Sequence, residues 1–201
     1  MHKKTNMAIF ASGAGSNAEK IMEHFENHPT VAVKLVVASK KTAGVLDIAR
    51  KFGVETLILN KTVFFDTNIY VKELQHQHID IVILAGFLWK VPANLVVAYQ
   101  NRILNIHPAL LPNYGGKGMY GHFVHEAVIA AKEKQSGITI HLVDEAYDHG
   151  KHLFQATCDI DILDSPDDLA GKIHVLEHRH FANVIEDYIK DNPALFDKNT
   201  A

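Results

Sequence analysis

Short apolar runs alternate with stretches of helical periodicity through the first half of the chain. Strands are predicted at residues 7–12, 31–38, 55–59, 79–85 and 102–106, and helices at 17–25, 43–52, 67–77 and after Pro92. The run at 79–85 is apolar on both faces, as expected for a central parallel strand. This alternation predicts an α/β fold with a doubly wound, mostly parallel, Rossmann-like sheet and helices on both faces.

The second half of the chain has a different pattern. A glycine-dense loop at 115–121 precedes a predicted helix at 122–133, and strands are expected at 137–143 and 152–162. The last helix has a clear start, with Ser165 as N-cap, Pro166 at the first position and Asp168 at the third, and it extends to about residue 190. Neither a repeat nor a linker interrupts the pattern, so we expect one domain over residues 1–201.

Composition narrows the class of protein. The chain has 201 residues, 47% of them hydrophobic, and a net charge of −3 without a basic stripe, so nucleic acid is not an expected partner. The single Cys158 excludes a disulfide framework and a cysteine-based zinc site. The first residues lead directly into a strand and no apolar run approaches membrane-spanning length, so we expect neither a signal peptide nor a membrane partner. These features predict a cytoplasmic protein.

Asn105 and His107 stand where the strand at 102–106 ends, and Pro108 prevents its continuation as a central strand. Side chains alternate along a strand, so both leave from the same face. In an open parallel sheet, ligands bind at this carboxyl edge. An amide beside a group that titrates near neutrality suits acyl-type proton transfer. The alternative is a turn in which Asn105 caps the chain and His107 packs in the core.

The loop between the first strand and the first helix reads Ser12-Gly13-Ala14-Gly15-Ser16-Asn17-Ala18 and fits the glycine pattern of dinucleotide sites. That pattern requires an acidic residue at the end of the second strand, where the chain has Ser39-Lys40-Lys41, so NAD is disfavoured. Backbone N–H groups at a helix start, together with Ser12, Ser16 and Asn17, suit a single terminal phosphate instead. The alternative is a tight turn without a ligand.

The segment from His141 to Gly150 ends a strand in a cluster of charge. A carboxylate next to His107 would raise the pKa of its imidazole, and the pattern does not choose among Asp144, Glu145 and Asp148. A solvated acidic turn is the alternative.

His174-Val175-Leu176-Glu177-His178 matches the inverted zinc-peptidase motif. A zinc site needs a third ligand, and a five-residue match arises easily among 14 His residues, so we predict no metal.

The order of these motifs resembles the phosphoribosylglycinamide formyltransferase family. Four segments carry the resemblance and span nearly the whole chain: Ser12–Asn17, Leu84-Ala85-Gly86-Phe87, Asn105–Pro112 and Gly137–Gly150. The Asn-x-His-Pro block and the Asp-x-Gly turn are shared by the formyltetrahydrofolate-using transferases of this fold. The Ser-Gly-x-Gly-Ser-Asn loop is narrower and points to the glycinamide ribonucleotide member.

The resemblance implies roles for particular residues. Asn105, His107 and Asp148 would be catalytic in transferring a formyl group from 10-formyltetrahydrofolate to the amine of glycinamide ribonucleotide, without a metal. The substrate phosphate would bind at Gly13, Ala14, Gly15, Ser16 and Asn17, and its ribose or glycinamide part at Glu177. The folate cosubstrate would bind at Leu88, Trp89, Lys90, Val91 and Asp144. Around Thr67 the chain lacks an Arg that the family often places near the folate.

Other functions remain open at this point. A formyltransferase for initiator methionyl-tRNA or a sugar nucleotide shares the fold, as does a formyltetrahydrofolate hydrolase. The tRNA enzyme carries an extra C-terminal domain and a basic surface, and the hydrolase normally carries an extra N-terminal domain. A non-catalytic nucleotide-binding module would leave Asn105, His107 and Asp148 idle. For Trp89 the alternative is core packing, which is the usual role of a lone Trp after a strand. We expect only small molecules as substrates, and a monomer or a homodimer.

Overall fold

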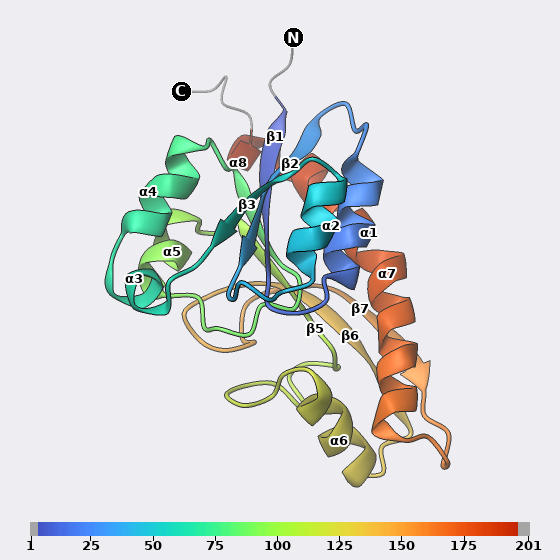
Figure 1. The fold of residues 1–201 in the computed structure, drawn as a ribbon. Helices are drawn as coiled ribbons and strands as arrows, with labels where there is room; N and C mark the ends of the chain where they lie inside the picture. The colour runs from blue at the N-terminus through green and yellow to red at the C-terminus, as the bar shows by residue number, and fades with distance from the viewer. Residues whose placement is uncertain (1–3, 197–201) are drawn as a thin grey trace.

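The structure, a computed structural model, describes residues 4–196 and is built on one seven-stranded sheet (Figure 1). The strand order is β3-β2-β1-β4-β5-β6-β7. Strands β1 to β5 run parallel, whereas β6 is antiparallel to both β5 and β7. The strand bounds are β1 Thr5–Ala11, β2 Val31–Ala38, β3 Glu55–Ile58, β4 Ile81–Leu84, β5 Ile103–His107, β6 Gln135–Leu142 and β7 His152–Asp159. The predicted α/β class and mostly parallel sheet are confirmed.

Helices cover both faces of the sheet because the strands are apolar on both sides. Along β1, Met7 and Ile9 pack into one core cluster with residues of α1, α2, α6 and α7. The alternate residues Ala8 and Phe10 pack into a second cluster with α3, α4 and α5. The helix bounds are α1 Ser16–Phe25, α2 Val45–Lys51, α3 Lys61–Asp66, α4 Ile69–His76, α5 Ala93–Ala98, α6 His122–Ala130, α7 Pro166–Asp191 and α8 Pro193–Phe196.

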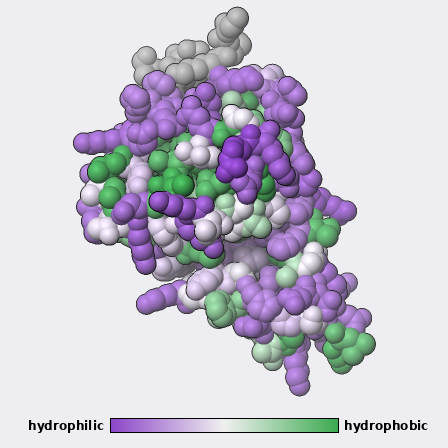
Figure 2. All heavy atoms as spheres, in the orientation of Figure 1, coloured by the Kyte–Doolittle hydropathy of each residue, from purple (hydrophilic) through white to green (hydrophobic). Residues whose placement is uncertain are grey.

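The strand order reverses at β1, which lies between β2 and β4. The chain leaves β1 and β4 toward opposite sides of the sheet, and a crevice opens between the loops that follow their carboxyl ends. The Ser12 N–H donates to the carbonyl of Gly86 at 3.0 Å and holds these two loops together. Figure 2 shows a mostly hydrophilic face with an indentation above the part of the molecule that carries α6. The fold therefore places a ligand-sized opening at the edge where the sequence motifs end.

The structure differs from the sequence prediction in a few elements. Helix α3 was not expected; Asn60 caps it by accepting a hydrogen bond from the Val63 N–H at 3.1 Å. The short helix α8 was also not predicted, and the predicted helix at 67–77 is the slightly shorter α4. Within residues 4–196, no helix is both long and apolar enough to cross a membrane.

Helix α7 begins where the sequence predicts, in a complete capping box. The Ser165 hydroxyl accepts from the Asp168 N–H at 3.2 Å, and the Asp168 carboxylate accepts from the Ser165 N–H at 2.9 Å. Each bond satisfies an N–H group that the first helical turn leaves unpaired. This cap fixes the start of the longest helix, which also carries Glu177 toward the crevice.

We predict that Ser165→Ala lowers the free energy of unfolding by about 1 kcal/mol, because the Asp168 N–H loses its acceptor. The melting temperature should fall by about 2–4 °C. Gly171→Ala is the matched control. Gly171 lies within the same helix at an exposed position with room for a Cβ, so this substitution should instead stabilise the protein by about 0.5–1 kcal/mol. Thermal and urea unfolding measure both effects, and equal stability of the two variants would contradict the prediction.

Candidate active site

A cavity of about 630 Å³ opens at the carboxyl edge of the sheet. It is lined by the loops after β1, β4, β5 and β6, by the glycine loop 115–121, and by one face of α7. The residues to which the family resemblance assigns a catalytic or binding role all lie along it: Gly13 to Asn17, Leu88 to Val91, Asn105, His107, Asp144, Asp148 and Glu177. The structure thus brings the predicted set into one place.

Asn105 and His107 occupy alternate positions at the carboxyl end of β5, and both face the cavity. Their neighbours on the antiparallel strand β6 are His141 and Thr139, respectively. His107 is only 3% exposed. The parallel strand β4 ends beside them, so the two side chains lie at the edge where the crevice opens.

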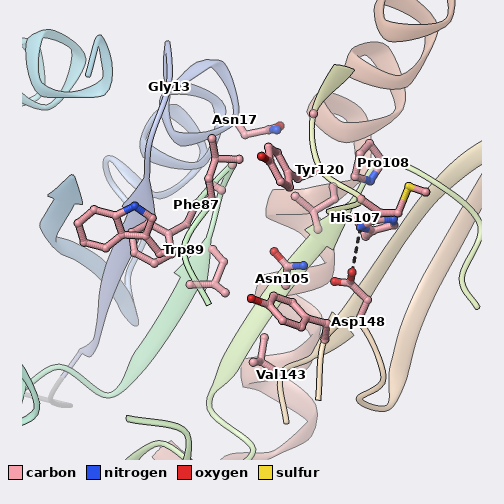
Figure 3. A pocket seen from close by; sticks show the side chains of 18 of the residues that line it. Gly13, Asn17, Phe87, Trp89, Asn105, His107, Pro108, Tyr120, Val143 and Asp148 are labelled. Carbon is pink, nitrogen blue, oxygen red and sulfur yellow. Dashed lines mark ion pairs between the residues drawn. The ribbon is translucent and has the colours of Figure 1, made fainter. Parts of the chain in front are cut away.

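The imidazole of His107 is held by two groups. Its Nε2 lies 2.8 Å from the carbonyl oxygen of Tyr114, which can only accept, so Nε2 carries a proton. Its Nδ1 lies 3.7 Å from Oδ2 of Asp148, and Figure 3 marks this ion pair. Burial lowers the pKa of His107, while the Asp148 carboxylate and the Tyr114 carbonyl oppose that shift. The site therefore sets charge stabilisation directly against desolvation.

His141 orients the Asn105 side chain, a role that the sequence analysis did not assign. Its Nδ1 donates to the carbonyl of Leu142 at 2.8 Å, which leaves Nε2 as an acceptor for the Asn105 Nδ2 at 3.1 Å. Burial lowers the pKa of His141 and favours this neutral form. One N–H of the carboxamide is thereby fixed on the imidazole, and the second N–H is free to donate elsewhere. Only the cross-strand register of β5 and β6 reveals this pairing.

Of the three acidic candidates in the loop after β6, Asp148 is the one placed beside His107. Its backbone has φ +52°, a left-handed conformation that Asp tolerates better than most residues. Its Oδ2 accepts from the Gly116 N–H at 2.9 Å, and its Oδ1 lies 3.7 Å from the Nε2 of His141. The carboxylate therefore lies between two imidazoles and also anchors the glycine loop.

The glycine loop after β1 forms another wall of the cavity. Gly15 has φ +90° and precedes α1, and a Cβ there would lie 2.7 Å from the Val45 Cβ. Ser12, which the sequence offered for phosphate, is instead 3% exposed: its hydroxyl accepts from the Leu88 N–H at 3.0 Å and from the Ser39 hydroxyl at 2.7 Å. Ser12 is therefore a structural residue, and the ligand-facing part of the loop is 13–17.

Glu177 reaches this loop from α7. The Asn17 Nδ2 donates to its Oε2 at 2.8 Å, and Glu177 is 6% exposed. Burial raises the pKa of Glu177, while the Asn17 hydrogen bond acts in the opposite direction. The Asn17 Oδ1 is buried and has no hydrogen-bond partner among residues 4–196. An unpaired buried acceptor on the wall of a cavity fits a ligand that brings a donor.

The segment after β4 forms the opposite side of the opening. Leu88 is about half exposed, and Trp89 lies half-buried against the rings of Phe64, Phe65 and Phe87. The Trp89 side chain therefore both packs and lines the cavity. Lys90 places its Nζ 5.2 Å from the centre of the Tyr147 ring, so the post-β4 and post-β6 loops meet there.

The sequence match to a zinc motif on α7 does not form a ligand set. The rings of His174 and His178 are stacked with centroids 6.2 Å apart, and Glu177 turns to Asn17. Among residues 4–196, no three His, Cys, Asp or Glu side chains are arranged to hold a metal ion.

Comparison with known proteins identifies the family. The sequence model of the family described as formyl transferase matches residues 5–185. The chain belongs to this formyl transferase family. It is 32% identical over 186 residues to phosphoribosylglycinamide formyltransferase of Bacillus subtilis, covering 89% of this chain and 92% of that one.

It is also 39% identical over 189 residues to the chloroplastic phosphoribosylglycinamide formyltransferase of Arabidopsis thaliana. That match covers 91% of this chain but 65% of the plant protein, and the Vigna unguiculata relative is matched over 61% of its length. The crystal structure of phosphoribosylglycinamide formyltransferase from Bacillus halodurans superposes with a TM-score of 0.85 at 32% identity, over 95% of this chain and 98% of that one. The formyl transferase fold predicted from the sequence is confirmed.

We predict that Asp148→Asn in this formyl transferase lowers the pKa of His107 further, because the anion that opposes desolvation is removed. Nitrogen-detected NMR titration of labelled histidine, assigned with His107→Asn, measures the change. Asp144→Asn is the matched control: its carboxylate is paired with His149 at 3.2 Å and its loss should leave the His107 titration unchanged. A His107 pKa that is equal in wild type and Asp148→Asn would contradict the electrostatic role of Asp148.

Proposed function

We propose that this protein transfers the formyl group of 10-formyltetrahydrofolate to the amine of 5-phosphoribosylglycinamide, a step of purine biosynthesis. The observation that carries the proposal is the convergence of Asn105, His107 and Asp148 on one cavity whose wall is the helix-start loop 13–17. Formyl transfer needs a donor for the developing oxyanion and a proton relay, and a phosphorylated acceptor needs an anion site. The names of the relatives agree with this substrate pair.

The proposed reaction begins with attack of the substrate amine on the formyl carbon. A tetrahedral intermediate forms with negative charge on the former carbonyl oxygen. The N–H of Asn105 that His141 does not engage donates to this oxygen. His141 fixes the carboxamide beforehand, so the donor needs no reorientation when charge develops.

His107 supplies the proton transfers. Its Nε2–H is committed to Tyr114, so the catalytic proton resides on Nδ1, the nitrogen that faces Asp148. In its protonated form, His107 adds positive charge near the oxyanion, and Asp148 stabilises that form. This form arises when the neutral imidazole takes up, on Nδ1, the proton released by the attacking amine, and it returns that proton to the folate nitrogen as the intermediate collapses. The proposed sequence uses no metal and no covalent enzyme intermediate.

The two substrates occupy opposite parts of the cavity in this proposal. Backbone N–H groups of Gly13 to Asn17 at the start of α1 bind the phosphate, and Asn17 and Glu177 accept hydrogen bonds from the ribose or glycinamide part. The formyl folate lies along Leu88 to Val91, with Asp144 at the opposite loop. We propose that residues 1–201 act as one catalytic domain on these small molecules. A cytoplasmic location and a monomeric or dimeric state stay predictions.

We predict amine-dependent release of tetrahydrofolate. When the purified protein is mixed with a 10-formyl folate analogue, the absorbance of the analogue should change only if glycinamide ribonucleotide is also present. Release without the amine would indicate a hydrolase. Absence of release, together with binding of the ribonucleotide, would indicate a non-catalytic module, and both of these results contradict the proposal.

We predict that His107→Ala and Asn105→Ala each reduce kcat by about a hundredfold or more, because each removes a group that acts on the charge of the intermediate. Steady-state kinetics measure the loss, and circular dichroism verifies that the variants fold. Tyr188→Phe, which loses a 2.8 Å bond to the Asn101 carbonyl, serves as the control and should retain normal turnover. Near-normal turnover of His107→Ala would end the mechanistic assignment.

We predict that Gly15→Ala raises the KM for glycinamide ribonucleotide at least about tenfold while changing the KM for the folate little. Alanine is strained at φ +90° and would collide with Val45, so the N–H groups aimed at the phosphate are displaced. Gly53→Ala is the control for backbone strain alone, with φ +65° and open space around it. An equal KM for the ribonucleotide in Gly15→Ala and wild type would contradict the proposal that loop 13–17 binds the phosphate.

A further inference from the structure

Tyr114 contacts two different groups with its backbone and its side chain. Its carbonyl oxygen accepts the Nε2–H of His107 at 2.8 Å, and its phenol donates to the Oε1 of Glu133 at 2.7 Å. Burial, followed by the hydrogen bond to Glu133, raises the pKa of Tyr114. One residue thus joins the proposed catalytic imidazole to a carboxylate on another segment.

The backbone of Tyr114 adopts a conformation that bulky residues rarely take. Its φ is +57°, in the left-handed region. Such a conformation persists only where surrounding contacts hold it, and it is typical of residues at functional sites. The direction of the Tyr114 carbonyl depends on this conformation. The side chain of Tyr114 forms its hydrogen bond with Glu133, and this bond anchors the phenol end of the residue, away from His107.

Glu133 is placed by the end of α6. Lys132 follows the helix with φ +56°, its N–H donates to the Ile129 carbonyl at 3.0 Å, and the Glu133 N–H donates to the Val128 carbonyl at 3.4 Å. Tyr114 and Glu133 therefore stand at the two ends of the segment 115–132. This segment contains the glycine loop and α6 (Figure 1). Its residues Gly116, Tyr120 and His125 line the cavity.

Neither the Tyr114 phenol nor Glu133 reaches the substrate cavity. Both residues line a separate surface hollow together with Asn113, Lys132 and Lys134. Any effect of these two side chains on catalysis must pass through the Tyr114 backbone or through the segment that they bracket. The other titratable groups around His107 are Asp148 from the loop after β6, His141 from β6 and His125 from α6. His141 and Asp148 lie outside segment 115–132, whereas His125 lies within it on α6.

We propose that Tyr114 and Glu133 form a positioning pair: their hydrogen bond closes the base of segment 115–132 and keeps the Tyr114 carbonyl on the Nε2–H of His107. The kinetic part of this inference rests on the proposed function; the titration of His107 does not. Loss of the bond lets the carbonyl turn away and removes one of the two groups that favour the charged imidazole. The Nε2–H of His107 then has no fixed acceptor, and the orientation of the imidazole ring is less well defined.

Tyr114→Phe and Glu133→Ala test the pair. Each should lower kcat about three- to tenfold, as expected for the loss of one hydrogen bond, with the KM for both substrates within about twofold of wild type. NMR titration should show a lower His107 pKa in both variants. Glu133→Gln keeps an acceptor oxygen and should recover most of what Glu133→Ala loses. The double variant should be no slower than either single variant, because both remove the same bond.

Tyr188→Phe is the matched control, since it removes a tyrosine hydrogen bond of 2.8 Å remote from the cavity. It should change neither kcat nor the His107 titration. If Tyr114→Phe does not fold, Glu133→Ala and Glu133→Gln carry the test. Folded Glu133→Ala protein with wild-type kcat and an unshifted His107 titration would overturn the positioning pair. If the wild-type protein transfers no formyl group, the proposed function is overturned. The NMR titration of His107 would still test the Tyr114–Glu133 positioning pair in that case.

Discussion

The proposed catalysis depends on keeping one nearly buried imidazole, that of His107, able to carry charge. His107 has almost no contact with solvent, and desolvation alone would hold it neutral. Two fixed groups oppose desolvation, the carboxylate of Asp148 on one side and the carbonyl of Tyr114 on the other. Because they engage different nitrogens, they also determine which proton is structural and which can move. Desolvation is the larger effect and the pKa of His107 is lowered, while Asp148 and the Tyr114 carbonyl limit that shift.

The Tyr114 carbonyl and the Asp148 carboxylate both belong to residues with a left-handed backbone conformation. The surroundings of the His107 imidazole therefore depend on loops as well as on the sheet. The sheet supplies the fixed points: β5 places Asn105 and His107, and β6 adds His141 beside them. The loops at 113–121 and 143–150 supply Tyr114 and Asp148, and the Gly116 N–H joins one loop to the carboxylate of the other. Substitution in either loop is therefore transmitted to the same imidazole.

Much of the fold follows from local pattern, and much of the site follows from the fold. The strand at 31–38 and the start of α7 after Ser165 are predicted where the structure has them, because apolar runs and cap residues are local signals. Helix α3 was missed because Phe64 and Phe65 are stabilised there by packing on Phe87 and Trp89, which lie far along the chain. The clustering of loop 13–17 with Asn105 and His107 was predictable, since parallel strands end at one edge.

The parts of the site that pattern could not supply are those set by register and backbone conformation. Residue type alone does not choose among Asp144, Glu145 and Asp148, and only the family resemblance points to Asp148. In the structure, the turn that gives Asp148 φ +52° brings its carboxylate beside His107. His141 becomes the partner of Asn105 only because β5 and β6 pair antiparallel with these two residues opposite each other. Ser12 looked like a phosphate ligand, yet its hydroxyl lies between Ser39 and the Leu88 N–H. In each case the residue type permits several roles, and the long-range geometry leaves one.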